Sequence, residues 1–266
     1  MERFLYLLSK SNHVDQFILK GALMMRVWDP HSVRPTLGID MLGRTSNDIA
    51  SIVQQIKSVL SVRVDPDGIE CEPASIRSER ILEDAEYEGI RIRFRGRLGT
   101  AVLPMLLDIG FGDIVFPNAI EEELPTILES PAPRLLCYSR ESVIAEKFEA
   151  MVNLGTLNSR IKDFHDIWLL SRQFDFDGMK LAEAIRLTFG KRNTVLPGRI
   201  EAFEHQFVSE KQVQWAAFRK RLGKLDLPES FGEIVLSIDE FVSPLVRLLK
   251  QKETLFPSWR AKGPWQ

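Results

Sequence analysis

Two neighbouring stretches, residues 89–97 and 100–110, constrain the fold of this chain most strongly. In the first, apolar side chains alternate with arginines, which is the period-two pattern of a strand with one buried face. The second is also rich in apolar residues, and Leu98-Gly99 between them favours a tight turn. The pattern predicts a β-hairpin. Pro104 has no backbone N–H to donate, so its position is expected at a sheet edge or a bulge.

Around the hairpin, the N-terminal part alternates between helical and strand patterns. Residues 1–10 and 13–28 show helical spacing, interrupted by an expected strand near Phe17-Ile18-Leu19. A strand is expected at 36–42, and the apolar spacing of 46–60 predicts a helix with Ser46 as its N-cap.

After Pro131-Ala132-Pro133 only helical patterns follow. Ser139 is expected to cap the first of these helices, and the tail 256–266 is expected to be irregular. The fold class is therefore α/β over residues 1–130, followed by an all-helical domain over 131–266. The predicted helices cover 139–154, 159–173, 178–189, 210–222 and 231–250.

Composition excludes several classes. The formal net charge of the 266 residues is −2, so a polyanion site must be a local patch. No apolar run reaches the roughly 18 residues that a membrane span needs, and the apolar stretch at the N-terminus is too short for a signal peptide. Cys71 and Cys137 are isolated, which suits a reducing compartment. We expect a cytoplasmic protein with no membrane partner.

The strand at 36–42 carries the first candidate for chemistry. Because side chains alternate faces, Gly38 and Asp40 share one side. An Asp-x-Asp strand would hold hard cations for phosphoryl transfer, but the first position here is glycine. The other interpretation of Asp40 is a residue that ends or caps the strand.

Asp108 is the second candidate, because it lies in an apolar strand. A buried carboxylate must be paired, hydrogen-bonded or bound to a metal. If the strands of Asp40 and Asp108 pair, both carboxylates face the same side of the sheet. Asp113, which follows two glycines, is interpreted as a turn residue.

Three further groups each have two interpretations. Lys20-Gly21-Ala22 is either a tight turn or a place where backbone N–H groups approach a triphosphate. Lys147 lies in an apolar stripe of its helix and either extends to solvent or binds nucleotide phosphates. Asp163 and Asp166 lie three residues apart, and the simpler interpretation is surface pairing, for example of Asp166 with Lys162.

The arginine face of the hairpin is the fourth group. It is either a solvated face, neutralised by Glu83, Asp84, Glu86 and Glu88, or a row of contacts for RNA phosphates. The arginines are Arg91, Arg93, Arg95 and Arg97.

Taken together and in order, five separated stretches resemble the AbiEii-type nucleotidyltransferase toxins of type IV toxin–antitoxin and abortive-infection systems. The link Pro131–Leu135 and the turn Phe174–Gly178 fit the same resemblance. The five stretches are Phe17–Leu23, Arg34–Asp40, Leu107–Asp113, Ser142–Ala150 and Asn158–Ile167.

The resemblance implies a polymerase-β-like nucleotidyltransferase domain with a mixed sheet, followed by a helical domain that completes the active-site cleft. It implies Mg²⁺-dependent transfer of nucleotides from a nucleoside triphosphate to the 3′ acceptor end of tRNA, which blocks aminoacylation. The implied partners are tRNA and a cognate antitoxin protein encoded nearby.

Site residues also follow from the resemblance. Asp40 matches the second aspartate of the metal-binding strand, and Asp108 is the expected third carboxylate, so both are expected to hold magnesium. The turn Lys20-Gly21-Ala22 matches the phosphate turn, Lys147 the nucleotide-contacting lysine, and Asp163 or Asp166 the helix aspartate.

Gly38 departs from the family pattern, which has the first aspartate there. Loss of even an indirect metal partner costs about 10–100-fold, so a weak or inactive catalyst is predicted. The alternative is a nucleotidyltransferase-fold protein without activity that binds RNA, nucleotide or the antitoxin.

Overall fold

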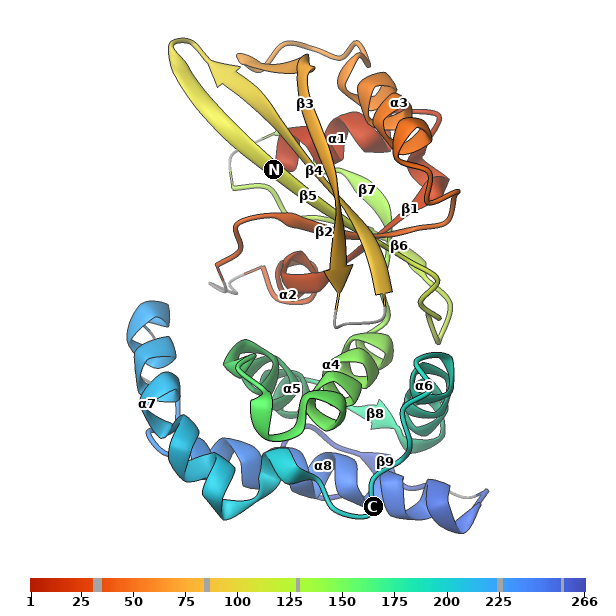
Figure 1. Ribbon diagram of the computed structural model, residues 1–266, viewed down its shortest axis with the longest axis vertical. Helices are drawn as coiled ribbons and strands as arrows, with labels where there is room; N and C mark the ends of the chain where they lie inside the picture. The colour runs from red at the N-terminus through yellow and green to blue at the C-terminus, as the bar shows by residue number, and fades with distance from the viewer. Residues whose placement is uncertain (31–34, 84–86, 128–129, 224–226, 255) are drawn as a thin grey trace. The chain divides into compact units, whose positions relative to one another are not determined.

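The computed structural model describes residues 1–30, 35–83, 87–127, 130–223, 227–254 and 256–266 (Figure 1). Arg34, the first residue of the second resembling stretch, lies outside the described residues. The chain forms two compact units. Unit 1 comprises Met1–Asp113 and Ala119–Tyr138, and unit 2 comprises Ile114–Asn118 and Ser139–Gln266.

Unit 1 is built on a mixed sheet of seven strands in the order β3-β4-β5-β2-β1-β7-β6. The pairs β2–β5 and β1–β7 are parallel and the other neighbours are antiparallel. The long strands β3, β4 and β5 run side by side (Figure 1). The strands are β1 (Phe17–Lys20), β2 (Ile39–Gly43), β3 (Ile69–Glu83), β4 (Tyr87–Leu98), β5 (Ala101–Phe111), β6 (Ile120–Glu123) and β7 (Arg134–Cys137).

The predicted hairpin is confirmed as β4 and β5, whose residues pair from Leu98↔Ala101 to Ile90↔Ile109. Pro104 pairs with Arg95 of β4 on one side, whereas the pairing of β5 with β2 begins only at Leu107. The missing N–H of Pro104 therefore breaks no ladder with β2. β5 is an internal strand over one half and an edge strand over the other.

The described residues of unit 1 form three α-helices, which are α1 (Glu2–Ser9), α2 (Met24–Trp28) and α3 (Ile49–Leu60). The N-cap of α3 is Asp48, whose Oδ2 accepts a hydrogen bond of 2.8 Å from the backbone N–H of Ser51, so the prediction of Ser46 was wrong. On the apolar side of the sheet, the ring of Phe4 lies 5.5 Å from that of Phe94. The arginines of β4 alternate with these buried residues and face the other way.

Over its described residues, unit 2 is helical apart from a short two-stranded antiparallel sheet, in which β8 (Phe176–Asp177) pairs with β9 (Ser258–Trp259) from the end of the chain. Ser139 caps α4 as predicted, accepting a hydrogen bond of 3.1 Å from Ser142 N–H. The prediction of an irregular tail was wrong at Ser258–Trp259, and the Trp265 ring stacks on Phe241 at 5.6 Å. The helices are α4 (Arg140–Leu154), α5 (Ile161–Gln173), α6 (Gly178–Lys191), α7 (His205–Leu222) and α8 (Phe231–Gln251).

The mixed sheet followed by helices confirms the predicted fold class, an α/β part followed by a helical part. The change of unit falls at Tyr138/Ser139, later than the predicted boundary near residue 130, because β6 and β7 extend the sheet of unit 1. Within the described ranges, no helix combines the length and the apolar character that crossing a membrane requires.

Candidate active site

Four charged residues lie at the same level of neighbouring strands in unit 1. Asp40 of β2 is the register partner of Asp108 on parallel β5 and of Lys20 on antiparallel β1. Asp108 is in turn the register partner of Arg91 on β4. Residues in register on adjacent strands project from the same face of a sheet. Arg91, Asp108, Asp40 and Lys20 therefore form one line across the sheet, which we call the charged row.

Arg91 holds Asp108 by two hydrogen bonds. Its Nε donates to Oδ1 and its Nη2 to Oδ2, both at 2.7 Å. The two side chains are 31% and 14% exposed, so the pair is only partly open to solvent. A bidentate arginine–carboxylate pair combines opposite charge with matched planar geometry and is among the stronger polar interactions in proteins. The carboxylate predicted to bind a metal thus has an arginine on both of its oxygens.

Lys20 and Asp113 form a second ion pair at the end of the charged row. Lys20 Nζ lies 2.9 Å from Asp113 Oδ2, and the two side chains are 9% and 7% exposed. The same ammonium lies 5.7 Å from the centre of the Tyr138 ring. Asp113 lies in the loop that follows β5, and its carboxylate is in addition the buried partner of a lysine, which its interpretation as a turn residue did not include.

Gly21 leaves the space that Asp40 occupies. A Cβ atom on residue 21 would lie 2.0 Å from Asp40 Oδ2, and the φ angle of Gly21 is +73°, a left-handed value that favours glycine. Its neighbour Ala22 is buried. The small residues predicted for nucleotide approach have a structural reason here, namely room for a carboxylate.

Gly38 is covered by Leu106 of β5. A Cβ atom on residue 38 would lie 3.1 Å from Leu106 Cδ2 and 3.3 Å from the Leu106 carbonyl oxygen. A side chain at residue 38 therefore requires Leu106 to move by a few tenths of an ångström. The apolar side chain lies where the carboxylate of the family pattern would begin.

These donors do not fit a pair of divalent cations. The described residues contain no group of three or more histidine, cysteine, aspartate or glutamate side chains that could hold a metal ion. The charged row offers Asp40 and Asp108, and both oxygens of Asp108 already accept hydrogen bonds from Arg91. Two-metal sites for phosphoryl transfer place two ions close together between carboxylates, and this row has too few.

Beyond the charged row, the remaining arginines of β4 pair with glutamates of β3. Arg93 lies 2.6 Å from Glu79, and both Arg95 and Arg97 contact Glu72. Hydrogen bonding from Arg97, with the nearby charges of Arg97 and Arg95, lowers the pKa of Glu72. The predicted neutralising residues Asp84 and Glu86 lie outside the described residues.

Unit 2 contains a buried ionic cluster between α4 and α5. Lys147 Nζ lies 2.5 Å from Asp163 Oδ1 and 2.8 Å from Asp166 Oδ2. Arg160 Nε donates to the other oxygen of Asp163, at 2.5 Å. The Lys147 side chain is 11% exposed and both carboxylates are buried. Lys147 does not extend to solvent, and Asp166 does not pair with Lys162 at the surface, so both simpler interpretations were wrong.

Charge balance keeps Asp163 ionised. Burial alone would raise the pKa of Asp163, but the Lys147 ammonium and the Arg160 guanidinium outweigh it, and the pKa is lowered. His165 Nδ1 lies 3.2 Å from Asp166 Oδ1, which adds a polar contact to the cluster. Arg160 and His165 were not singled out from the sequence, although both lie in the resembling stretch Asn158–Ile167 and Arg160 stands three residues before Asp163, a spacing that allows pairing on a helix.

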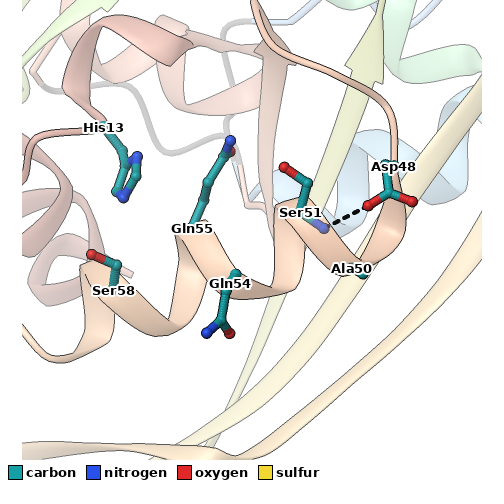
Figure 2. A pocket seen from close by; sticks show the side chains of 7 residues that line it. All are labelled: His13, Asp48, Ala50, Ser51, Gln54, Gln55 and Ser58. Atoms are coloured by element: carbon teal, nitrogen blue, oxygen red, sulfur yellow. Dashed lines mark hydrogen bonds between the residues drawn. The ribbon is translucent and has the colours of Figure 1, made fainter.

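A pocket of about 600 Å³ lies along α3, away from the charged row in sequence and lined by none of the predicted site residues. Figure 2 shows its polar side chains projecting from one helix beside His13. The apolar spacing of residues 46–60 predicted the helix but gave no sign of a hollow beside it. The lining residues are His13, Asp48, Ala50, Ser51, Gln54, Gln55 and Ser58.

Two solved structures from Helicobacter pylori match this chain over most of its length. One, provisionally described as a nucleotidyltransferase, shares 14% identity, covers 95% of both chains and has a TM-score of 0.46. The other, JHP933, shares 14% identity, covers 94% of this chain and 90% of its own, and has a TM-score of 0.47. None of the curated proteins matches this chain.

A family model matches much more directly. The model described as "Nucleotidyl transferase AbiEii toxin, Type IV TA system" matches residues 3–237, which include the charged row and the cluster of α4 and α5. Because this match spans most of the sequence, the chain belongs to the AbiEii family of nucleotidyl transferase toxins of type IV toxin–antitoxin systems.

Proposed function

We propose that this protein transfers nucleotides from a nucleoside triphosphate to the 3′ acceptor end of tRNA, at a rate lowered by Gly38. The observation that carries the proposal is the register of the sheet. It brings Asp40 and Asp108 to the same level of one face, next to the turn at Gly21. Family membership supports nucleotidyl transfer as the reaction class.

The chemical role of each residue follows from its charge. The oxygen of the terminal tRNA hydroxyl forms a bond to the α-phosphorus of the triphosphate and gives up its proton to solvent, while the bond from the α-phosphorus to the leaving pyrophosphate breaks. Lys20 and Arg91 are the cationic groups at the two ends of the charged row, and we expect them to contact the phosphate oxygens of the substrate. The turn at Gly21-Ala22 is expected to let the phosphates approach the backbone. We expect the substrate to arrive as a magnesium complex, because Mg²⁺ is commonly held by substrate phosphates with few protein carboxylates.

In unit 2, Lys147 remains the predicted ligand of nucleotide phosphates, and Asp163 and Asp166 remain the predicted acidic residues. These assignments rest on the resemblance of Ser142–Ala150 and Asn158–Ile167 to the family, while the geometry gives Lys147 a second role as the counterion of two buried carboxylates. Both roles require the same protonated ammonium.

We further propose that Arg93, Arg95 and Arg97 contact RNA phosphates. These side chains are about half exposed, and they project from the face of β4 that carries Arg91. The A-form acceptor stem of tRNA is recognised mainly by shape and backbone contacts, which arginines provide. A protein antitoxin is the expected regulatory partner, because the family belongs to toxin–antitoxin systems.

The test is incubation of the full chain with bulk tRNA, Mg²⁺ and each labelled nucleoside triphosphate in turn. We expect incorporation of label at the tRNA 3′ end. Asp40→Asn should reduce it by at least about 10–100-fold, the usual effect of losing a group that supports a metal or phosphate centre. Gln54→Ala, an exposed change on α3, is the control and should leave incorporation unchanged. Absence of label with every triphosphate contradicts the proposal.

A second candidate function is nucleotide or RNA binding without transfer. The observations that favour it are the missing carboxylate at Gly38 and the arginine held on Asp108. Melting temperatures measured with each triphosphate and Mg²⁺, beside the incorporation assay, separate the two functions. A rise in melting temperature without incorporation supports binding alone.

A further inference from the structure

We propose that the Arg91 guanidinium takes the place of a divalent cation at Asp108. The site then has no resident metal at this carboxylate, and its fixed positive charge comes from the protein itself. The inference rests on the proposed function in one respect, namely that the charged row is the nucleotide site. It concerns this chain's own residues, whose donor set does not fit the metal pair that the reaction class implies.

The first argument is geometric. Arg91 donates to both carboxylate oxygens of Asp108 at 2.7 Å, so the guanidinium lies in the direction from which a bidentate cation would approach. A metal ion can bind both oxygens of Asp108 only if these hydrogen bonds break. The arginine and a metal ion therefore compete for the same position.

The second argument is that the backbone holds Arg91 in this position. Arg91 and Asp108 are direct register partners on antiparallel β4 and β5. The neighbours of Arg91 on its strand, Ile90 and Ile92, are fully buried on the opposite face of the sheet. The strand cannot slip without exposing them, because a shift of one residue reverses every side chain. The fixed register of β4 against β5 therefore holds the guanidinium at Asp108.

The third argument is the charge of the region. Arg91 and Lys20 provide two positive charges, and Asp108, Asp40 and Asp113 provide three negative ones. A net charge of −1 attracts a divalent cation much less than an unpaired group of carboxylates does. Gly38 removes the next carboxylate, and Leu106 covers its position with an apolar side chain. The absent acid at residue 38 and the arginine bound to Asp108 both weaken cation binding.

The consequence is a site in which the protein alone binds divalent cations weakly. A cation then enters with the phosphates of the nucleotide, and Arg91 provides the charge that a second ion provides elsewhere. Removal of the guanidinium should restore Asp108 as a cation ligand beside Asp40.

The test measures Mn²⁺ binding to the full chain without nucleotide or RNA, by the electron paramagnetic resonance signal of free Mn²⁺. We expect weak binding by the wild type and binding at least about tenfold tighter by Arg91→Gln, since metal partners contribute about 10–100-fold to affinity. The double variant Arg91→Gln with Asp108→Asn should return to the wild-type level. Arg93→Gln is the matched control, because it removes the same charge from the same face of β4 but contacts Glu79.

Several outcomes overturn the inference. Tight binding of two Mn²⁺ ions by the wild type would do so, as would unchanged affinity in a folded Arg91→Gln variant. Circular dichroism establishes folding. If Arg91→Gln does not fold, the single variant Asp108→Asn is measured instead. Unchanged Mn²⁺ binding by this variant supports the inference, and weaker binding overturns it. Because no triphosphate or tRNA is present, a failure of the proposed transfer activity leaves these results unaffected, and the two proposals fail separately.

Discussion

At the scale of single residues, the contact between Gly38 and Leu106 controls how the missing carboxylate can be restored. A Cβ on residue 38 meets both the side chain and the backbone oxygen of Leu106, at 3.1 and 3.3 Å. The side-chain contact can be removed by mutation, whereas the backbone contact requires a small shift. Position 38 has no left-handed backbone angle, so glycine is not required there by conformation.

We therefore expect Gly38→Asp to raise nucleotide incorporation into tRNA, and Gly38→Asp with Leu106→Ala to raise it further. The single variant should also lose about 1–3 kcal/mol of unfolding free energy from overpacking, and part of this loss should be recovered in the double variant. Incorporation of label and chemical denaturation measure the two effects. Leu106→Ala alone is the control for incorporation. Equal transfer by all four proteins would show that residue 38 does not limit the reaction.

The sequence predicted some of the positions of these charged residues but not their partners. Alternation along two strands predicted correctly that Asp40 and Asp108 face one side if the strands pair, and they do pair. The same pattern did not predict that Arg91 holds Asp108, because the partner across a hairpin depends on register and not on local composition. The ion pair of Asp113 with Lys20 was not predicted for a related reason: the two residues lie far apart in the sequence.

At the scale of elements, the ionic cluster joins α4 to α5. Lys147 is the counterion that Asp163 and Asp166 share, and Asp163 also contacts Arg160. Truncation of one partner of a buried ion pair leaves an uncompensated charge in a low-dielectric environment. The cluster therefore makes the packing of these two helices sensitive to a single side chain.

We expect Lys147→Met to destabilise the protein by about 3–5 kcal/mol, the usual cost of removing one member of a buried ion pair. Lys162→Met is the matched control, because Lys162 is an exposed lysine on α5, and we expect its effect to stay within about 0.5 kcal/mol. Urea denaturation monitored by circular dichroism compares the two variants. Similar midpoints for both would mean that the cluster contributes little to stability.

The elements themselves were predicted unevenly. Helices with regular apolar spacing were found, including α4 with its Ser139 cap. Strand β3 was missed, because Ile69–Glu83 carries charged residues on both faces and lacks a clear alternation. Its glutamates Glu72 and Glu79 neutralise the arginines of β4, so missing the strand also meant missing these partners. Edge strands of this kind depend on the neighbouring strand for their definition.

At the scale of the whole molecule, the net charge of −2 is small although positive and negative side chains are concentrated in separate rows on neighbouring strands. The arginine face of β4 carries Arg93, Arg95 and Arg97, opposed by Glu72 and Glu79. RNA can bind to this face only if its phosphates replace the glutamates as partners of the arginines. Affinity for tRNA should therefore depend on these glutamates as well as on the arginines.

We expect the triple variant Arg93→Ala, Arg95→Ala and Arg97→Ala to bind tRNA more weakly and to reduce the salt slope by about 1 for each phosphate that is no longer neutralised. Glu72→Gln should strengthen binding, because it releases two arginines from their shared partner. Filter binding at several salt concentrations measures both. Arg91 is left intact because it holds Asp108. An unchanged slope in the triple variant would exclude this face as an RNA-binding surface.

The organisation of the whole chain was predictable in outline. The change from mixed patterns to helical patterns indicated an α/β part followed by a helical part, and both are present. The order in which the chain passes between the two units was not predictable. Ile114–Asn118 belongs to unit 2, and the following segment Ala119–Tyr138 belongs to unit 1 again. Hydrogen bonds from Ser139 and Ser142 to Phe116 hold that segment, and such contacts leave no periodic signal.

Because a methyl group at position 21 would overlap the carboxylate of Asp40, mutations at these two positions are not independent. A change of residue 21 to alanine would therefore require a shorter side chain at residue 40 in the same step, so these two positions are expected to persist or to change as a pair.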